Sequence, residues 1–255
     1  MTFLYLFGVR QQFLYVNTDV SRLDQRAYLH AAELLKTSNY TALTDRNRMP
    51  VFPFLLSLLY EPGMSEAAFF ARGKLLNVGL SLLILPILYW IFRQHLPLFT
   101  AVNLILIHIF TVYIFKAAYA QTELLFYLFN FLIFLLMCRL LRHPSWQWGI
   151  VTGIAIGIAH LTKASILPGF MLYLAIAFVQ AIVLNFKEKA KQNKIQNVAR
   201  HFAVPLLVLL FFLLTVFPYI QNSKERFGHY FYNVNSTFYI WYDSWGEAKA
   251  GTRAH

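Results

Sequence analysis

The sequence has 255 residues, 58% of them hydrophobic, and a formal net charge of +11. A soluble core does not require so apolar a composition, whereas a chain that folds in a bilayer does. In a soluble protein the positive charge would suggest a nucleic-acid partner. In a membrane protein it marks loops at the membrane face, so we expect membrane lipids, and no nucleic acid, as partners.

The chain begins with a hydrophobic stretch, 1–16, that is short and interrupted by Arg10. It lacks the early positive charges, the apolar centre and the small-residue cleavage site of a secretory signal. We interpret 1–16 as a partial first span.

Residues 17–74 form a more polar segment in which we expect amphipathic helices at the outer membrane surface. Apolar side chains recur at helical spacing over 25–36, which predicts a helix that lies on the membrane. The next stretch, TSNYTALTDRNR, is a loop by composition. The stretch MPVFPFLLSLLYEPG is too short to span and contains three prolines, which fits a helix that dips into the interface.

About six apolar runs follow within 75–220, and most approach the roughly 20 residues that a bilayer core requires. Because backbone polar groups in lipid must pair internally and no strand alternation is present, we predict that the runs are helices. The predicted fold class is an all-α integral membrane protein, a polytopic helical bundle that forms a single transmembrane domain over 1–255. The runs are 75–92, 97–115, 121–138, 146–162, 164–186 and 202–220, and a polar, aromatic tail follows them at 221–255.

Gly149, Gly153 and Gly157 recur every four residues in the fourth of these runs. Small residues at this spacing let two helix backbones approach closely in lipid. We prefer this packing role to a contact with a ligand.

The basic residues predict which ends of the spans face the cytoplasm, since short cytoplasmic loops collect positive charge. Arg72 and Lys74 precede the first run on the outer side and count against the predicted orientation. In that orientation 17–74, Glu123, Lys163 and the tail 221–255 share the non-cytoplasmic face. The cytoplasmic side receives Arg93, Arg139, Arg142, Lys187, Lys189, Lys191, Lys194 and Arg200, and the outer hairpins hold only Lys116 and Lys163.

Asp24 lies between the partial first span and the helix predicted over 25–36. A carboxylate near the lipid headgroups could deprotonate an acceptor hydroxyl or hold a divalent cation. An aspartate just before a helix can equally accept hydrogen bonds from the backbone amides of the first turn. Spacing alone slightly favours this capping role.

Three cationic residues could bind a phosphate on the same face. Arg46 and Arg48 lie just before the interfacial segment, and guanidinium groups bind phosphate through paired hydrogen bonds. Their alternative role is to anchor the chain at the interface. Lys163, at the outer end of the fourth run, could pair with phosphate or extend to the interface.

Glu123 opens the third run, where a carboxylate is either functional or favoured by the helix dipole. His160 lies one turn before Lys163 and is better explained as a hydrogen-bonded packing residue than as a metal ligand. The sequence contains no His/Cys cluster with metal-ligand spacing and no glycine loop of the phosphate-cradling type. We therefore predict no protein metal site, and soluble nucleotide chemistry is unsupported.

Four stretches of the chain together resemble the GT-C superfamily of polyprenyl-phosphate-sugar glycosyltransferases. Within it, they are most similar to the dolichyl- or polyprenyl-phosphate-mannose protein mannosyltransferases and to the bacterial lipid A aminoarabinose transferase. The resemblance runs through roughly residues 20–175. The stretches are LDQRAYLHAAELL, NRMPVFPFLLSLLY, AYAQTELLFYLF and GIAIGIAHLTKASILPGF.

The resemblance implies that Asp24 is the catalytic acid of the first outer loop, and that Arg48, Glu123 and Lys163 match further motifs of the family. Many relatives carry a glutamate directly after this aspartate, where the present chain has Gln25. A mechanism with paired acids is therefore in doubt here. The family usually has further spans, so the resemblance implies an N-terminal fragment.

We predict a membrane glycosyltransferase of the hexosyl or mannosyl type that moves a sugar from a polyprenyl-phosphate donor to a lipid, glycan or protein acceptor. Asp24 would act as general base or orient a divalent cation, the one cofactor considered. Arg46, Arg48 and Lys163 would neutralise the donor phosphate. A substrate or acid role is also considered for Glu123, Tyr28 and His160.

The expected location is a bacterial inner membrane, with the site on the periplasmic side. The sequons at Asn39 and Asn235 would matter only in a eukaryotic lumen. A transporter or flippase for a lipid-linked or anionic substrate is the alternative from another class. Charges at the span ends and the lack of repeated halves argue against it. An inactive fragment is a further alternative.

Overall fold

The computed structural model describes residues 2–42, 48–187, 194–230, 244, 246 and 247. Every regular element in these residues is helical, which confirms the predicted all-α class. The chain forms two compact units, 1–41 with 51–129 (unit 1) and 42–50 with 130–255 (unit 2).

Five of the described helical segments are long and apolar enough to cross a membrane. They are Glu66–His95, Leu98–Lys116, Glu123–Arg142, Ala164–Phe186 and Val198–Phe227. The remaining predicted run, 146–162, is the helix α8, Trp146–Thr162, whose 17 residues are about 25 Å long and shorter than a bilayer core of about 30 Å. The chain is thus a polytopic helical membrane protein.

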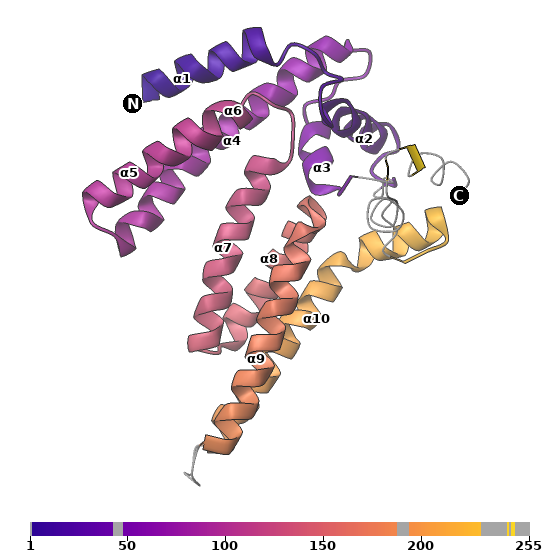
Figure 1. Cartoon of the computed structure of the whole chain (residues 1–255). Helices are drawn as coiled ribbons and strands as arrows, with labels where there is room; N and C mark the ends of the chain where they lie inside the picture. Colours follow the sequence, from indigo (N-terminus) through magenta and orange to yellow (C-terminus); the bar gives the residue numbers. More distant parts are fainter. Residues whose placement is uncertain (1, 43–47, 188–193, 231–243, 245, 248–255) are drawn as a thin grey trace. The chain divides into compact units, whose positions relative to one another are not determined.

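Unit 1 begins with the helix α1 (Thr2–Gln11), which continues into the π-helical turn η1 (Gln12–Val16). It also contains α2 (Gln25–Thr37), α3 (Val51–Ser57), α4 (Glu66–His95), α5 (Leu98–His108), η2 (Ile109–Tyr113), α6 (Ile114–Lys116) and the first part of α7 (Glu123–Arg142) (Figure 1). The helix predicted over 25–36 is confirmed as α2. The helix α3 starts directly after Pro50 and is too short to span, as predicted.

A cluster of buried apolar side chains joins α2, α3 and α4. The ring of Tyr28 packs edge-on against Phe52, with 5.4 Å between the ring centroids. Burial of this apolar surface orients α2 and α3 against the start of α4, which positions the segment between η1 and α4. The members of the cluster are Tyr28, Leu29, Ala32, Phe52, Leu56, Phe69, Phe70 and Ala120.

The helix α4 begins nine residues before the apolar run that predicted it. The Ser65 side chain accepts a hydrogen bond from the Ala68 amide at 3.3 Å and so caps the helix. As a result Arg72 and Lys74 belong to α4 itself rather than to the loop before it. The apolar pattern could not reveal this start, because the first turns of α4 lie outside the apolar run.

Unit 2 contains the rest of α7, then α8, η3 (Ala164–Ile166), α9 (Leu167–Lys187) and α10 (Lys194–Phe227), and α10 packs along both α8 and α9 (Figure 1). A Cβ atom added to Gly153 would lie 2.5 Å from the Val208 carbonyl oxygen, and one added to Gly157 would lie 2.5 Å from the Thr215 Cβ. The predicted packing role of the glycines is confirmed, since Gly153 lies against the backbone of α10 and Gly157 against the Thr215 side chain of α10, with no room for a Cβ atom at either position.

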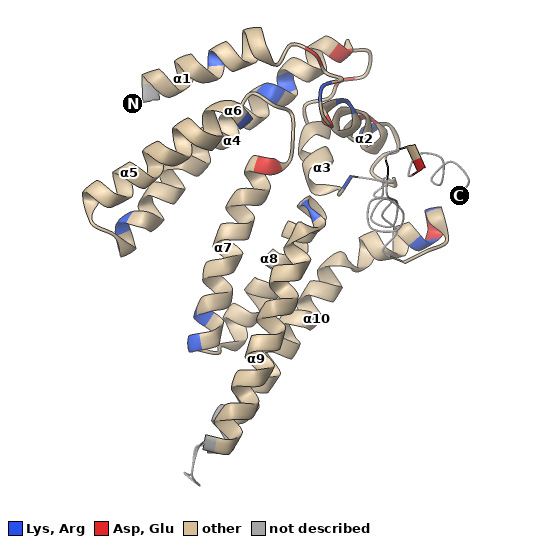
Figure 2. Ribbon diagram, viewed as in Figure 1, with Lys and Arg blue, Asp and Glu red and all other residues tan. Residues whose placement is uncertain are grey.

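The charged residues lie at helix ends and in connecting segments, while the middle parts of α7 to α10 are free of them (Figure 2). In unit 2, Arg139 and Arg142 end α7, and Lys163 follows the last residue of α8. The length of α8 therefore separates them. Much of the connector that carries the lysines of 187–201 (188–193) and most of the predicted tail lie outside the described residues.

Candidate functional site

Asp24 occupies the position before the first residue of α2 and is exposed. Its carboxylate makes no capping hydrogen bond to that helix, so the capping role that spacing favoured is wrong. The residue before it, Leu23, is 63% exposed and has a left-handed backbone with φ 59°. That conformation costs a non-glycine residue roughly 1–2 kcal/mol, so other contacts must hold this turn.

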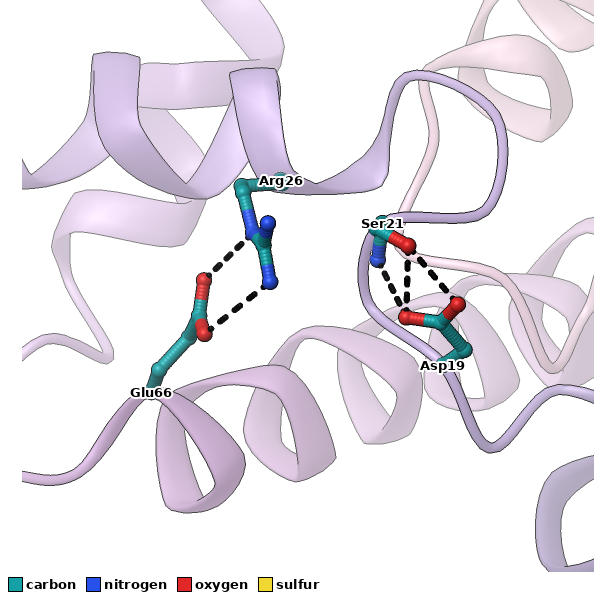
Figure 3. Close-up of polar contacts among 4 residues, drawn as sticks. All are labelled: Asp19, Ser21, Arg26 and Glu66. Carbon is teal, nitrogen blue, oxygen red and sulfur yellow. Dashed lines mark hydrogen bonds and ion pairs between the residues drawn. The ribbon is translucent and has the colours of Figure 1, made fainter.

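Short-range polar contacts hold the turn on its N-terminal side. Ser21 donates to the Asp19 carboxylate from its hydroxyl at 2.7 and 2.8 Å and from its amide at 2.8 Å (Figure 3). These hydrogen bonds lower the pKa of Asp19 below its usual value. Arg22 donates to the Val16 carbonyl at 2.9 Å. The loop that leads to Asp24 is therefore held by hydrogen bonds within it and to the end of η1.

Gln25, the residue after Asp24, is completely buried. Its amide forms a doubly hydrogen-bonded pair with the amide of Asn17, with both bonds at 2.8 Å. Gln25 also donates to the Arg22 carbonyl and accepts from the Ala120 amide, each at 3.0 Å. The start of α2 is thereby tied to the end of η1 and to the segment before α7.

The helix α4 adds three buried polar residues to unit 1, all on one side at spacings of three and four. Lys74 donates to the carbonyls of Phe13 and Asn17, each at 3.0 Å. Asn77 donates to the Tyr119 carbonyl and, at 2.7 Å, to the Gln121 carbonyl, and Ser81 accepts from the Tyr5 hydroxyl at 2.5 Å. Each of them thus ties α4 to a different part of the unit.

The segment 118–121 is therefore fixed from two directions. Asn17 and Gln25 bind its residues 118 and 120, and Asn77 binds its residues 119 and 121. Glu123, which is half-buried, begins α7 two residues later, where the helix dipole favours a carboxylate. Within unit 1 the candidate acids Asp24 and Glu123 thus flank one hydrogen-bonded network.

The sequence interpretation missed this network, although one signal for it existed. Lys74, Asn77 and Ser81 follow helical spacing at the start of an otherwise apolar run. Polar residues inside a membrane helix are expensive unless they find partners, so their alignment on one face predicts a polar contact there. Their partners, separated by 42 to 76 residues in several cases, could not have been named from sequence.

Tyr28 is buried in the cluster that joins α2, α3 and α4, with its ring against Phe52. This contact gives the ring a packing role. Its possible substrate role stays a prediction.

The candidate cations divide between the described and the undescribed residues. Lys163 follows the last residue of α8 and is half-buried, and Arg48 is also half-buried. Both belong to unit 2. Arg46 lies outside the described residues. The prediction that Asp24 and these cations share one pocket therefore stays a prediction.

His160 is 3% exposed in unit 2 and packs edge-on against Phe212, with 5.7 Å between the ring centroids. Its Nδ1 has no hydrogen-bond partner within the described part of the chain. His160 is therefore buried and packed as predicted, but its Nδ1 does not make the expected hydrogen bond, and its possible substrate or acid role stays a prediction. Among the described residues, no group of three or more His, Cys, Asp or Glu side chains could hold a metal ion.

A cleft of about 390 Å³ opens in unit 1 between α2, the loop that follows α3 and the start of α4. Arg26 pairs with Glu66 at 2.9 Å (Figure 3), and the Tyr60 hydroxyl donates to Glu33 at 2.8 Å, which raises the pKa of Tyr60. The lining residues are Arg26, Leu29, His30, Glu33, Tyr60, Met64, Glu66 and Phe69.

The charges of this cleft decide what it can bind. Glu66 pairs with Arg26, the single guanidinium of the lining, and Glu33 is a second acid, so acids outnumber the Lys and Arg side chains of the lining by one. A phosphate would be repelled, while hydroxyl or ammonium groups would be accepted. The cleft is therefore unsuited to a donor phosphate. The sequence could not predict it, because its walls come from three separate segments.

Comparison with known protein families adds an independent observation. The sequence profile described as dolichyl-phosphate-mannose-protein mannosyltransferase matches residues 57–230, more than half of the chain. The match includes Glu123, His160 and Lys163 and begins after Asp24 and Arg48. No curated protein and no solved structure matches the chain.

Proposed function

Because the chain belongs to the dolichyl-phosphate-mannose-protein mannosyltransferase family, we propose that it transfers a mannosyl or related hexosyl group from a polyprenyl-phosphate donor to an acceptor hydroxyl. The acceptor is a protein, glycan or lipid, and transfer takes place on the non-cytoplasmic face. The family match carries this proposal, and the membrane-spanning helices fit it, since such a donor is dissolved in lipid.

Asp24 is the proposed general base. Its carboxylate takes the proton of the acceptor hydroxyl while the hydroxyl oxygen bonds to the anomeric carbon. The bond from that carbon to the phosphate oxygen breaks, and the polyprenyl phosphate leaves with the electron pair. One observation supports this role: Asp24 is exposed, so an acceptor hydroxyl can reach it. General-base catalysis of this kind contributes roughly 10²–10⁴-fold in rate.

Arg48 and Lys163 are the proposed partners of the donor phosphate, with Arg46 as an assistant. Fixed cations stabilise the negative charge that develops on the leaving phosphate. Lys163 ends α8 within the matched region of the family, at the opposite end from Arg142. The proposed steps use only side chains of the chain.

The proposed orientation places 17–74 and Lys163 outside. Arg72 and Lys74 counted against it as basic residues before the first run. Arg72 donates to the Leu59 carbonyl and pairs with Glu61 at 2.7 Å, and the buried Lys74 binds two backbone carbonyls. Both cations have internal partners, so they weigh less against the orientation. We propose a bacterial inner membrane with the site on the periplasmic side.

The test is transfer of radiolabelled mannose from a polyprenyl-phosphate-mannose donor by the purified protein in lipid nanodiscs. A mixture of hydroxyl-bearing peptides and lipids serves as acceptor, and the donor alone shows background hydrolysis. Labelled product formed by the wild type supports the proposal. Donor movement across a sealed vesicle without any product would instead favour a transporter or flippase.

A further inference from the structure

The side chain of Gln25 uses its entire hydrogen-bonding capacity inside unit 1. An amide has two N–H donors and two acceptor positions on its oxygen. The nitrogen donates to the Asn17 side-chain oxygen and to the Arg22 carbonyl, and the oxygen accepts from the Asn17 side-chain nitrogen and from the Ala120 backbone amide. A residue this well satisfied and fully buried is rigid.

The partners also fix which end of each amide is nitrogen and which is oxygen. The Arg22 carbonyl can only accept, and the Ala120 amide can only donate, so Gln25 has a single consistent orientation. The same reasoning applies to Asn17, whose nitrogen donates to the Ala118 carbonyl at 2.7 Å. The surroundings of residue 25 therefore require an amide side chain, and another polar group of the same size would not satisfy them.

A carboxylate at position 25 would not fit. It has no donor for the Asn17 oxygen or the Arg22 carbonyl, and oxygen atoms would face each other at about 2.8 and 3.0 Å. It would also place a charge at a fully buried position, which is costly without a paired cation. The charged groups near this position have other roles: the Lys74 ammonium binds the carbonyls of residues 13 and 17, and Arg22 binds Val16.

We propose that Gln25 is a positioning residue, which holds the neighbouring Asp24 in place through its amide and leaves Asp24 without a second acid directly beside it in the sequence. The turn before it contains Leu23 in a left-handed conformation, and the bond from Gln25 to the Arg22 carbonyl closes that turn. The bond to Ala120 ties the same turn to the segment that leads into α7. The role of Asp24 in this inference rests on the proposed function.

The experiment compares wild type with Gln25→Glu, in the nanodisc transfer assay and by hydrogen–deuterium exchange of 19–28. Gln180→Glu is the matched control: Gln180 also donates its amide to a backbone carbonyl, that of Leu141 at 2.9 Å, but in unit 2. Asn17→Asp is a second variant, which keeps the acceptor for the Gln25 nitrogen while removing the donors to the Gln25 side-chain oxygen and to the Ala118 carbonyl.

The expected result for Gln25→Glu is a fall in kcat on the order of 100-fold, because a misplacement of about 1 Å costs that much. The KM for the donor should stay within about threefold, since the donor site is not altered. Exchange of 19–28 should become about tenfold faster or more, as the turn opens locally. Asn17→Asp should show the same two changes in weaker form, and Gln180→Glu neither.

Several results would overturn the inference. A kcat of Gln25→Glu close to wild type, or a loss confined to KM, would remove the positioning role. So would unchanged exchange of 19–28 in both network variants, a result that is informative even if wild type transfers no sugar and the proposed function fails. If Gln25→Glu does not fold, Asn17→Asp decides by the same two measurements. Loss of activity in Gln25→Glu but not in Asp24→Asn would show that Gln25 acts on something other than Asp24.

Discussion

The contact between α8 and α10 gives a prediction whose size follows from the coordinates. A Cβ atom on residue 153 would lie 2.5 Å from the Val208 carbonyl oxygen, 2.8 Å from the Phe211 Cβ and 3.2 Å from the Phe212 backbone nitrogen. Two of these atoms belong to backbone and cannot rotate away. Gly153→Ala must therefore push α8 and α10 apart by several tenths of an ångström or more, and we expect a cost of about 1–3 kcal/mol, typical of an overpacked core.

Gly169→Ala in α9 is the matched control, because a Cβ atom there would meet nothing within 4 Å. Alanine is the better helix former, so this change should be neutral or slightly stabilising. The assay is thermal unfolding in detergent, followed through reaction of the single cysteine, Cys138, with a fluorogenic thiol reagent.

At roughly 2–4 °C per kcal/mol for a chain of this size, Gly153→Ala should lower Tm by about 2–12 °C and Gly169→Ala should not. An unchanged Tm for Gly153→Ala would refute the close packing of α8 on α10. An equal decrease in both variants would show that the loss comes from glycine replacement in general.

Three further predictions concern Lys74, the pair of Arg72 and Glu61, and Lys163. Lys74→Met should lower the stability of the protein by about 2–4 kcal/mol, measured by the same thermal assay, because the half-buried Phe13 carbonyl and the buried Asn17 carbonyl lose their donor. An unchanged Tm would contradict these contacts. The Arg72 guanidinium lowers the pKa of Glu61, so wild type should be more stable than Glu61→Gln at neutral pH. This difference in stability should disappear as the pH falls below about 4 and should shrink in high salt. A difference that persists at low pH would argue against this pair. Lys163→Gln should reduce mannosyl transfer on the order of 10²–10³-fold, with Lys163→Arg retaining more activity; equal activity of both variants would argue against a charge role.

The helices of this protein were largely predictable because lipid leaves the chain few alternatives. Long apolar runs must become helices, and the helical spacing over 25–36 sufficed to predict α2. The four-residue spacing of Gly149, Gly153 and Gly157 predicted a close helix contact, though not that the partner is α10. Helix ends that lie outside the apolar runs could not be predicted in this way, as the early start of α4 shows.

The candidate site was only partly predictable. Asp24 was chosen as a candidate from its place in the chain, but the same spacing suited a helix cap, and only the geometry of the first turn of α2 argues against the cap. In the sequence, Gln25 stood out only because many relatives carry a glutamate directly after this aspartate. Its importance became visible only with Ala120 and Asn17 beside it, since hydrogen-bond partners 95 and 8 residues away leave no periodic signal.

The most direct test of the account is mannosyl transfer by wild type and by Asp24→Asn under saturating donor, with equal folding of the two proteins verified by thermal unfolding. Asparagine keeps the size of the side chain and removes the basic carboxylate. The account predicts product from the wild type and a rate lower by roughly 10²–10⁴-fold in Asp24→Asn. Transfer by Asp24→Asn at a rate near that of the wild type would contradict it.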